Sequence, residues 1–199
     1  MIKREIYLEK LRRLKDQRLI KVITGIRRSG KSTLLEAFRN ELLESGVPKK
    51  NIVFFNFEER ENLHLTEWAI LYDDIIKRIA SDRQHYVFLD EVQLVNNFEK
   101  LISGLFTKKN IDLYVTGSNA YLLSSELATL LSGRYIAINV QSYSFAEYTL
   151  ANSKEKNTDR LFRKYLNSSG FPEAVTLAQS DDLLVNDYLQ SIYDSVVIK

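Results

Sequence analysis

The stretch LIKVITGIRRSGKSTLL (residues 19–35) joins an apolar run to a turn with two glycines and then to a helical pattern. Residues 19–24 predict a short buried strand, and apolar residues recur at helical spacing from Ser32 to Leu43. Between them, Gly25 to Ser32 fit the pattern G-x-x-x-x-G-K-[ST]. This order of strand, loop and helix predicts a backbone that curls around phosphate groups at a helix N-terminus.

The loop also carries the side chains that a bound nucleotide needs. Lys31 would place a positive charge on the β- and γ-phosphates, and the hydroxyl of Ser32 would ligate Mg²⁺. ATP and Mg²⁺ are therefore the expected ligands. For Arg27 and Arg28, phosphate contact and simple solvation remain alternatives. The expected nucleotide-binding residues are Gly25, Ile26, Arg27, Arg28, Ser29, Gly30, Lys31, Ser32 and Thr33.

A second motif places two carboxylates at the end of an apolar strand. Tyr86 to Leu89 are apolar, and Asp90 and Glu91 follow directly. Ligands of open α/β sheets bind at the carboxyl ends of the strands. We expect Asp90 to hold Mg²⁺ through water and Glu91 to act as general base towards the attacking water. The alternative is an acidic strand end that only begins a loop.

Small polar residues follow a further strand at the same expected edge. The run Thr116-Gly117-Ser118-Asn119 would let Ser118 and Asn119 orient the attacking water or sense the γ-phosphate. The alternative is an ordinary turn with a helix N-cap. Asn56, near the end of the run NIVFFNF, is a candidate for holding Glu91 in a resting position.

Apolar runs and helical patterns alternate along most of the chain. Strands without strict alternation, separated by helices, predict a parallel sheet buried on both faces. The expected fold is therefore α/β, a three-layer sandwich with a five-stranded parallel sheet over residues 1–145, including an N-terminal helix. Residues 146–199 are expected to form a small helical lid. The expected strands are 19–24, 51–57, 86–89, 111–116 and 135–140, and the expected helices 3–15, 32–43, 66–80, 98–106, 121–131, 159–167 and 181–195.

Composition excludes several classes of protein. The chain has 199 residues, of which 45% are hydrophobic and 27% charged, so it is neither collagen-like nor disordered. The absence of Cys excludes disulfide frameworks and Cys-ligated metals. No apolar run is long enough to span a bilayer, so we expect a cytoplasmic protein without a membrane partner. His64 and His85 stand apart, without metal-ligand spacing.

Positive charge gathers at the beginning of the chain. The net charge is only +2, but residues 1–28 hold ten basic and three acidic residues. A basic segment of this kind either faces a phosphate-rich partner or forms a solvated helix face.

The ordered motifs resemble the AAA+ branch of P-loop ATPases. VITGIRRSGKSTLL resembles the Walker A segment, YVFLDEVQ the Walker B segment and YVTGSNA the sensor-1 strand. LLSGRYIAINVQSYSFAEY and the later SGFPEAV are similar to a group of prokaryotic AAA-type ATPases that usually carry a C-terminal domain of unknown function. The resemblance covers nearly the whole chain.

The resemblance implies roles for three further residues. Arg134 stands where the family has its arginine finger, which would reach the γ-phosphate of a neighbour in a homo-oligomer; a surface salt bridge is the alternative. Pro172 lies in a G-x-P turn that places it near the adenine, and Tyr7 could close the other side. Arg160 and Arg163 precede that turn, so no arginine is assigned as sensor 2.

The expected function is Mg²⁺-dependent ATP hydrolysis that drives an effector part. Residues 193–199 are an apolar helical stretch without a cap, so we expect the chain to be the N-terminal part of a longer protein. The missing part would carry the output and any contact with nucleic acid. The alternatives are a nucleotide-gated regulatory module with little hydrolysis, and a small-molecule kinase. Glu91 beside Asp90 disfavours the kinase because it suits activation of water.

Overall fold

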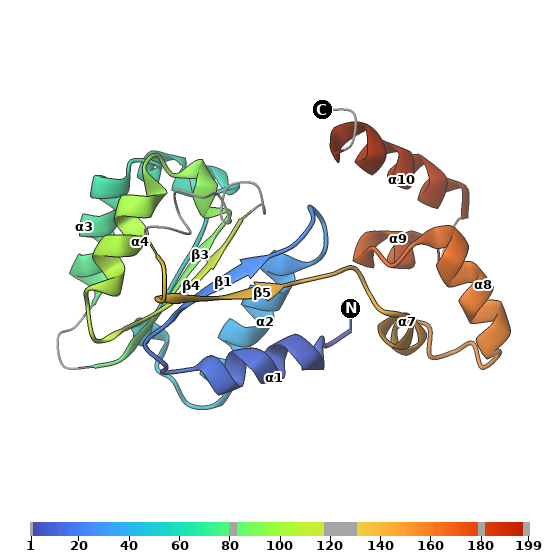
Figure 1. Ribbon diagram of the computed structural model, residues 1–199, viewed down its shortest axis with the longest axis horizontal. Helices are drawn as coiled ribbons and strands as arrows, with labels where there is room; N and C mark the ends of the chain where they lie inside the picture. The colour runs from blue at the N-terminus through green and yellow to red at the C-terminus, as the bar shows by residue number, and fades with distance from the viewer. Residues whose placement is uncertain (1, 80–82, 118–130, 179–181, 197–199) are drawn as a thin grey trace. The chain divides into compact units, whose positions relative to one another are not determined.

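Five strands form one parallel sheet in the order β2-β3-β4-β1-β5 (Figure 1). The computed structural model describes residues 2–79, 83–117, 131–178 and 182–196. The five-stranded parallel sheet and the α/β fold predicted from the sequence are confirmed. The strands are β1 (Ile20–Thr24), β2 (Ile52–Asn56), β3 (His85–Asp90), β4 (Ile111–Thr116) and β5 (Tyr135–Asn139).

The chain divides into two compact units. A sheet unit contains residues 5–25 and 31–139, and a lid unit contains residues 1–4, 26–30 and 140–199. The glycine-containing turn of residues 25–32, the phosphate loop, therefore contributes residues to both units. The helices of the sheet unit are α1 (Glu5–Leu14), α2 (Lys31–Glu44), α3 (Trp68–Arg78) and α4 (Phe98–Phe106), with short 3₁₀ helices η1 (Lys49–Asn51), η2 (Arg60–Leu65) and η3 (Val92–Leu94).

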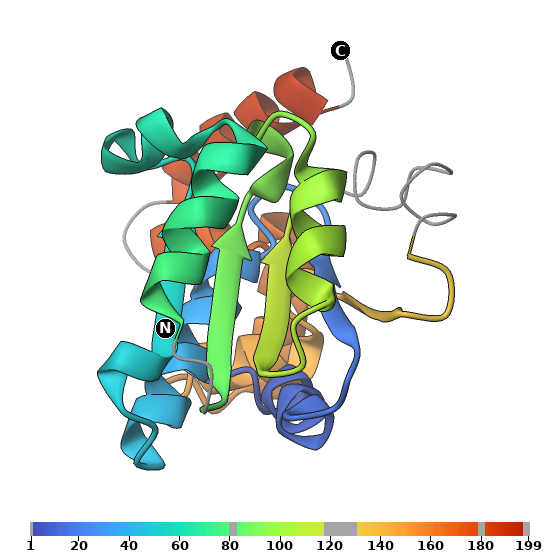
Figure 2. The ribbon, with the colours of Figure 1, turned by 90° about the vertical axis from the view of Figure 1, so that its left-hand side faces the viewer.

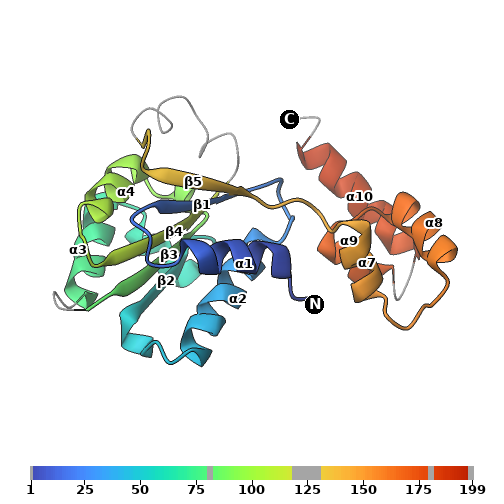
Figure 3. The same ribbon diagram turned by 60° about the horizontal axis from the view of Figure 1, so that its bottom comes forward.

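Helices cover both faces of the sheet. Helices α3 and α4 lie in front of the strands in Figure 2, and α1 and α2 lie side by side on the opposite face in Figure 3. Two-sided cover explains why all six residues of β3 are buried. On the α3 and α4 side, Val87 and Leu89 join the main apolar cluster. On the other side, Phe88 stacks on Tyr114 with ring centroids 4.8 Å apart.

The lid unit is helical after residue 140. It contains α7 (Phe145–Ala151), α8 (Thr158–Ser168), α9 (Pro172–Leu177) and α10 (Asp182–Val196). A capping box begins α7, because Ser144 accepts from the backbone N–H of Glu147 and the Glu147 carboxylate accepts from that of Ser144. None of the described helices is long and apolar enough to span a bilayer.

The structure contains short helices that the sequence pattern did not predict. Helices α7 and α9 are each shorter than eight residues and lie in stretches without a long apolar period. Helix η2 lies between the expected strand 51–57 and the expected helix 66–80, where no element was expected. The helix expected at 121–131 lies almost wholly outside the described residues.

Candidate nucleotide-binding site

The carboxyl ends of the central strands bring the predicted acidic and hydroxyl residues together within the sheet unit. Asp90 ends β3 and Thr116 ends β4, its neighbour, while Gly25 follows β1. Because all strands are parallel, these residues lie at one edge of the sheet. Lys31 begins α2, so its side chain belongs to the first turn of a 14-residue helix. Positive charge from the N–H groups of that turn favours an anion there.

Lys31 is buried, with only 6% of its side chain exposed. Its Nζ donates to the carbonyl oxygen of Gly25 at 3.4 Å and lies 3.7 Å from Oε1 of Glu91. Helix α2 and the strand end of β3 thus place an ammonium group beside the candidate general base. A phosphate group arriving at this helix end would meet that ammonium group directly.

Asp90 is held by hydroxyl groups from two elements. Thr116 on β4 donates to Oδ1 of Asp90, and the Ser32 hydroxyl lies close enough to the carboxyl group to lower its pKa. Burial raises the pKa of Asp90, while the hydroxyl groups of Thr116 and Ser32 act in the opposite direction. Asp90 is 1% exposed, so its carboxylate has exchanged bulk water for these two partners.

This donor set fits Mg²⁺. Magnesium prefers hard oxygen ligands and keeps several of its waters, so one carboxylate and one hydroxyl beside a phosphate suffice. Among the described residues there is no group of three or more His, Cys, Asp or Glu that could form an all-protein metal cage. Ser32 and Asp90 therefore provide the kind of site that magnesium shares with a phosphorylated ligand.

Glu91 has a left-handed backbone conformation. Its φ is 53°, in the left-handed region that non-glycine residues rarely adopt. Its N–H donates to Oγ1 of Thr116 at 3.0 Å, so Thr116 contacts both acidic residues. Strain of this kind is typical of functional sites, where the surrounding structure maintains it.

Gln93 is a site residue that the sequence reasoning missed. Its Nε2 donates to Oε2 of Glu91 at 2.5 Å, and its buried Oε1 has no hydrogen-bond partner among the described residues. Asn56, the candidate from sequence for this contact, instead accepts from the backbone N–H of Glu58 at 3.0 Å. The signal in the sequence was the amide two residues after Glu91, in DEVQ.

The remaining loop residues belong to the lid unit. Ser29 is fully buried, and its hydroxyl has no hydrogen-bond partner in the part of the chain that the structure describes. The φ angles of Arg28 (66°) and Gly30 (93°) are positive, which turns the backbone as a phosphate-binding nest requires. A Cβ added at Gly30 would lie 3.7 Å from Cγ of Pro172, so the predicted turn residue packs against this loop.

Arg4 holds the same loop from the N-terminal side. Its Nη1 donates to the carbonyl oxygen of Ser29 at 3.1 Å and to that of Gln141 at 2.7 Å. Its guanidinium group also pairs with the carboxylate of Glu147 at the start of α7. From the sequence, Arg4 is only one residue of the basic segment, because no local pattern reveals a partner more than 100 residues away.

The other predicted site residues are exposed, half-buried or outside the residues that the structure describes. Arg134 is exposed, before β5, with its guanidinium group 6.0 Å from the ring centroid of Phe106. Tyr7 is half-buried on α1, and Ile26, Arg27 and Thr33 are exposed. Ser118 and Asn119 lie outside the described residues.

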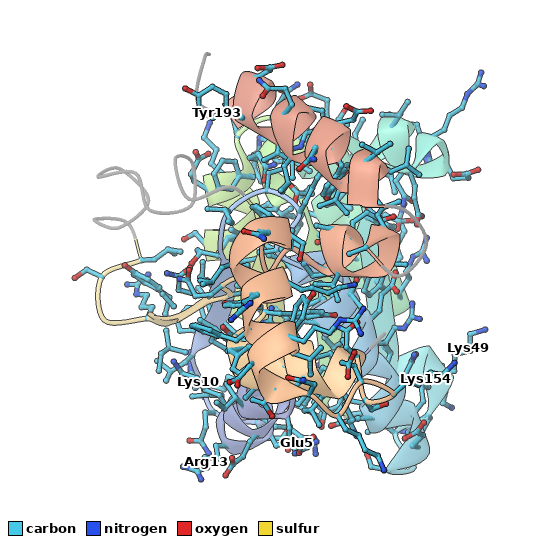
Figure 4. The ribbon with its side chains drawn as sticks, turned by 90° about the vertical axis from the view of Figure 1, so that its right-hand side faces the viewer. Glu5, Lys10, Arg13, Lys49, Lys154 and Tyr193 are labelled. Atoms are coloured by element: carbon cyan, nitrogen blue, oxygen red, sulfur yellow. The ribbon has the colours of Figure 1, made fainter. Side chains whose placement is uncertain are left out.

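Much of the basic N-terminal charge is paired within the molecule. Arg12 bonds Glu41 at 2.9 Å, Arg13 pairs with Glu9 on the next turn of α1, and the buried Lys21 pairs with Asp112. Figure 4 shows Glu5, Lys10 and Arg13 on the outer side of α1. These pairs support the interpretation of a solvated helix face.

Comparison with known proteins identifies the family and the fold of this chain. The sequence profile of a family described as "AAA domain" matches residues 17–149. An uncharacterized protein of Haemophilus influenzae is 40% identical over the whole chain and 50% of its own length. One of Methanocaldococcus jannaschii is 29% identical over 90% of this chain and 42% of its own length. The chain thus spans about half the length of these relatives.

A solved structure shows the same fold at low sequence identity. AMPPCP-bound DnaA from Aquifex aeolicus superposes with a TM-score of 0.60 at 15% identity, over 90% of this chain and 61% of that one. The match supports the fold, and the family profile covers the loop, the acidic strand end and the sheet that carries both. This chain belongs to the family of AAA domains.

Proposed function

We propose that the chain binds ATP with Mg²⁺ and hydrolyses it to ADP and phosphate. One observation carries the proposal: Lys31, Ser32, Asp90 and Glu91 meet at one sheet edge, where Thr116 bonds to both acidic residues. A cation, two magnesium ligands and a general base are the parts that phosphoryl transfer to water requires. Membership of the AAA domain family supports the nucleotide as ligand.

Binding would use the phosphate loop and the first turn of α2. The backbone N–H groups from Gly25 to Thr33 would face the phosphate oxygens, and Lys31 would exchange its distant contact with Glu91 for the β- and γ-phosphates. Ser32 and Asp90 would hold the magnesium ion, which supplies charge stabilisation to the transferring phosphoryl group. Contact of Tyr7 and Pro172 with the adenine stays a prediction from the family resemblance.

Hydrolysis would then depend on Glu91. Its carboxylate accepts a proton from water while the water oxygen bonds to the γ-phosphorus, and the bond from that phosphorus to the bridging oxygen of ADP breaks. The proton leaves Glu91 with the phosphate product or to solvent. Gln93 would orient the carboxylate, since its amide already donates to Oε2. Ser118 and Asn119 are proposed to position the water.

Assembly and output form the second part of the proposal. Arg134 is exposed on the sheet unit, as a residue must be if it is to reach a neighbouring copy of the chain. We therefore expect a cytoplasmic homo-oligomer in which Arg134 contacts the neighbour's γ-phosphate. The curated relatives are about twice as long as this chain, so the effector part and any nucleic-acid contact would lie in the rest of the protein.

A nucleotide-gated module with little hydrolysis is the second candidate. The observation that favours it is the contact of Arg4 with both the Ser29 carbonyl and Glu147, because the loop and the start of α7 share one anchor. In that case ATP would still bind and order the lid unit, but turnover would be negligible.

Calorimetric titration with ATP and Mg²⁺ tests the binding step. Lys31→Ala should weaken binding about 100-fold, because each hydrogen bond to a charged phosphate contributes about 1.5–3 kcal/mol. Lys10→Ala is the matched control on the exposed face of α1 and should bind as the wild type does. Unchanged affinity of Lys31→Ala would contradict the assignment of the loop.

Turnover measured against protein concentration tests the role of Arg134. A rate per protomer that rises with concentration, and falls by about 10³-fold or more in Arg134→Ala, is expected of a residue acting across an interface. A rate per protomer that is independent of protein concentration would show that Arg134 does not act on the nucleotide of a neighbouring copy.

A further inference from the structure

A groove of about 690 Å³ lies beside β2, and none of its described lining residues belongs to the nucleotide-binding motifs. Four basic side chains line it: Arg39 from α2, Lys49 and Lys50 from η1, and Arg78 from α3. None of the described residues that line it is acidic. The whole groove belongs to the sheet unit, so its shape does not depend on the lid unit.

Most of this positive charge is not neutralised inside the molecule. Arg78 pairs with Asp74 at 2.8 Å, and Arg39 donates to the neutral amide oxygen of Asn40. Lys49 and Lys50 are exposed, and the ion pairs of the described residues do not include them. Figure 4 shows Lys49 extending away from the ribbon. The groove is therefore complementary to a partner with several negative charges.

The wall of the groove is the edge of the sheet. In the described sheet, β2 has β3 as a neighbour on one side and no strand on the other. An edge strand presents backbone N–H and C=O groups that can pair with a further extended chain. This second feature is independent of the charge, and it points to a peptide backbone as the partner.

The positions of the two arginines fit such an added strand. The Arg39 guanidinium group lies 4.8 Å from the ring centroid of Phe54, and that of Arg78 lies 5.2 Å from the ring centroid of Phe55. Phe54 and Phe55 are consecutive, so the two arginines flank opposite faces of β2. Successive side chains of an added strand also point to opposite faces, so neighbouring acidic residues would each meet one arginine.

We propose that the β2 edge binds an extended acidic peptide segment by strand addition, with its carboxylates on Arg39, Arg78 and the Lys49–Lys50 pair. A single-stranded nucleic acid would match the positive charge of the groove but would have no backbone N–H groups to pair with β2. The Phe54 ring, on which a base would stack, already has Arg39 over it. Lysines beside an edge strand can also serve only to prevent strand pairing. The experiment must separate these cases.

Fluorescence anisotropy with a dye-labelled peptide of about ten residues, in which pairs of adjacent Glu alternate with pairs of Val, is the direct test because adjacent Glu side chains lie on opposite faces of a strand. Binding to the wild-type chain should be saturable and should weaken as salt screens the charges. Lys49→Glu with Lys50→Glu should weaken it about tenfold or more, since like charges now face each other. The matched control is Lys108→Glu with Lys109→Glu, which changes the same charge at two exposed lysines outside the groove.

A peptide of the same sequence that is methylated on every backbone nitrogen tests strand addition itself. Its charge is unchanged, but it cannot donate to the β2 edge, so its binding should be lost. Equal binding of the methylated peptide, or equal loss in the control variant, would overturn the proposal. So would tighter, groove-dependent binding of an oligothymidylate of equal charge, which would make the site one for nucleic acid.

Two further outcomes would also overturn it. The absence of saturable binding by the acidic peptide would mean that the lysines only protect the edge. Wild-type self-association that the groove variant abolishes, seen by sedimentation velocity, would mean that the edge pairs with a second copy of the chain. Circular dichroism spectra check that both charge-reversal variants fold. Folding is expected because all four lysines are exposed.

Discussion

Arg4 and Glu147, which are 143 positions apart in the sequence, form a bidentate ion pair. The Nε to Oε1 distance is 2.8 Å and the Nη2 to Oε2 distance is 3.1 Å. Arg4 is 6% exposed and also donates to the Ser29 carbonyl, while Glu147 closes the capping box of α7. One ion pair therefore anchors the phosphate loop, the N-terminal segment and the first lid helix together.

Glu147→Gln should destabilise the lid unit by about 1.5–3 kcal/mol at neutral pH, the usual contribution of hydrogen bonds to a charged group. Burial raises the pKa of Glu147, but bonds from Arg4 and Ser144 outweigh it and hold the pKa below its ordinary value of 4.5. A depressed pKa contributes stability above the unfolded-state value, and this contribution is lost as the pH falls through the folded-state value.

Urea unfolding at neutral and at acidic pH checks this prediction. The difference between the wild type and Glu147→Gln should shrink below the ordinary glutamate pKa. Glu9→Gln, which removes the exposed partner of Arg13, is the control and should cost within about 0.5 kcal/mol. A difference that stays constant with pH would contradict the ion-pair account.

Lys21 and Asp112 form a buried pair at the opposite ends of β1 and β4 from the site. Burial lowers the pKa of Lys21, and the charge of Asp112 opposes this shift. Burial raises the pKa of Asp112, and the charge of Lys21 opposes that shift. Lys21→Met should cost about 3–5 kcal/mol, because it leaves the buried Asp112 carboxylate without its cation. Adding Asp112→Asn should recover part of the loss in urea unfolding. Additive losses would show that the two charges do not interact.

Gln93→Ala should lower ATP turnover about tenfold and leave the ATP dissociation constant within about twofold, because a misplaced general base affects the chemical step. Stopped-flow phosphate release and calorimetry provide the two measurements. Asn56→Ala is the control, since the side chain of Asn56 contacts Glu58 and not Glu91. Equal loss in both variants would remove Gln93 from the positioning of Glu91.

Position 170 requires glycine because a side chain would clash there, and not because of a positive φ angle. A Cβ there would lie 2.3 Å from the carbonyl oxygen of Tyr143, and the Gly170 carbonyl accepts from the N–H of Tyr143 at 2.6 Å. Gly170→Ala should destabilise the lid unit by about 3 kcal/mol or more through this clash. Gly46→Ala, at φ 91° with open space, should cost only about 1 kcal/mol. Equal thermal shifts would contradict the argument.

The sequence predicted the sheet because each strand is a short apolar run followed by a helical pattern. It also predicted the edge at which Asp90 and Thr116 meet, since parallel strands end on the same side. It could not predict the contacts of Arg4 with Glu147 or of Lys21 with Asp112, which depend on three-dimensional packing across more than 90 residues. The Gln93 contact was missed because it depends on the left-handed conformation of Glu91.

Phosphate release from ATP by the wild-type chain and by Glu91→Gln, at saturating ATP and Mg²⁺, tests the central claim most directly. We expect turnover by the wild type and a loss of about 10²–10⁴-fold in Glu91→Gln, with ATP binding retained. Replacement by Gln keeps the size and the polarity of the side chain but removes its ability to accept a proton. Equal phosphate release by the two proteins would contradict hydrolysis at this site.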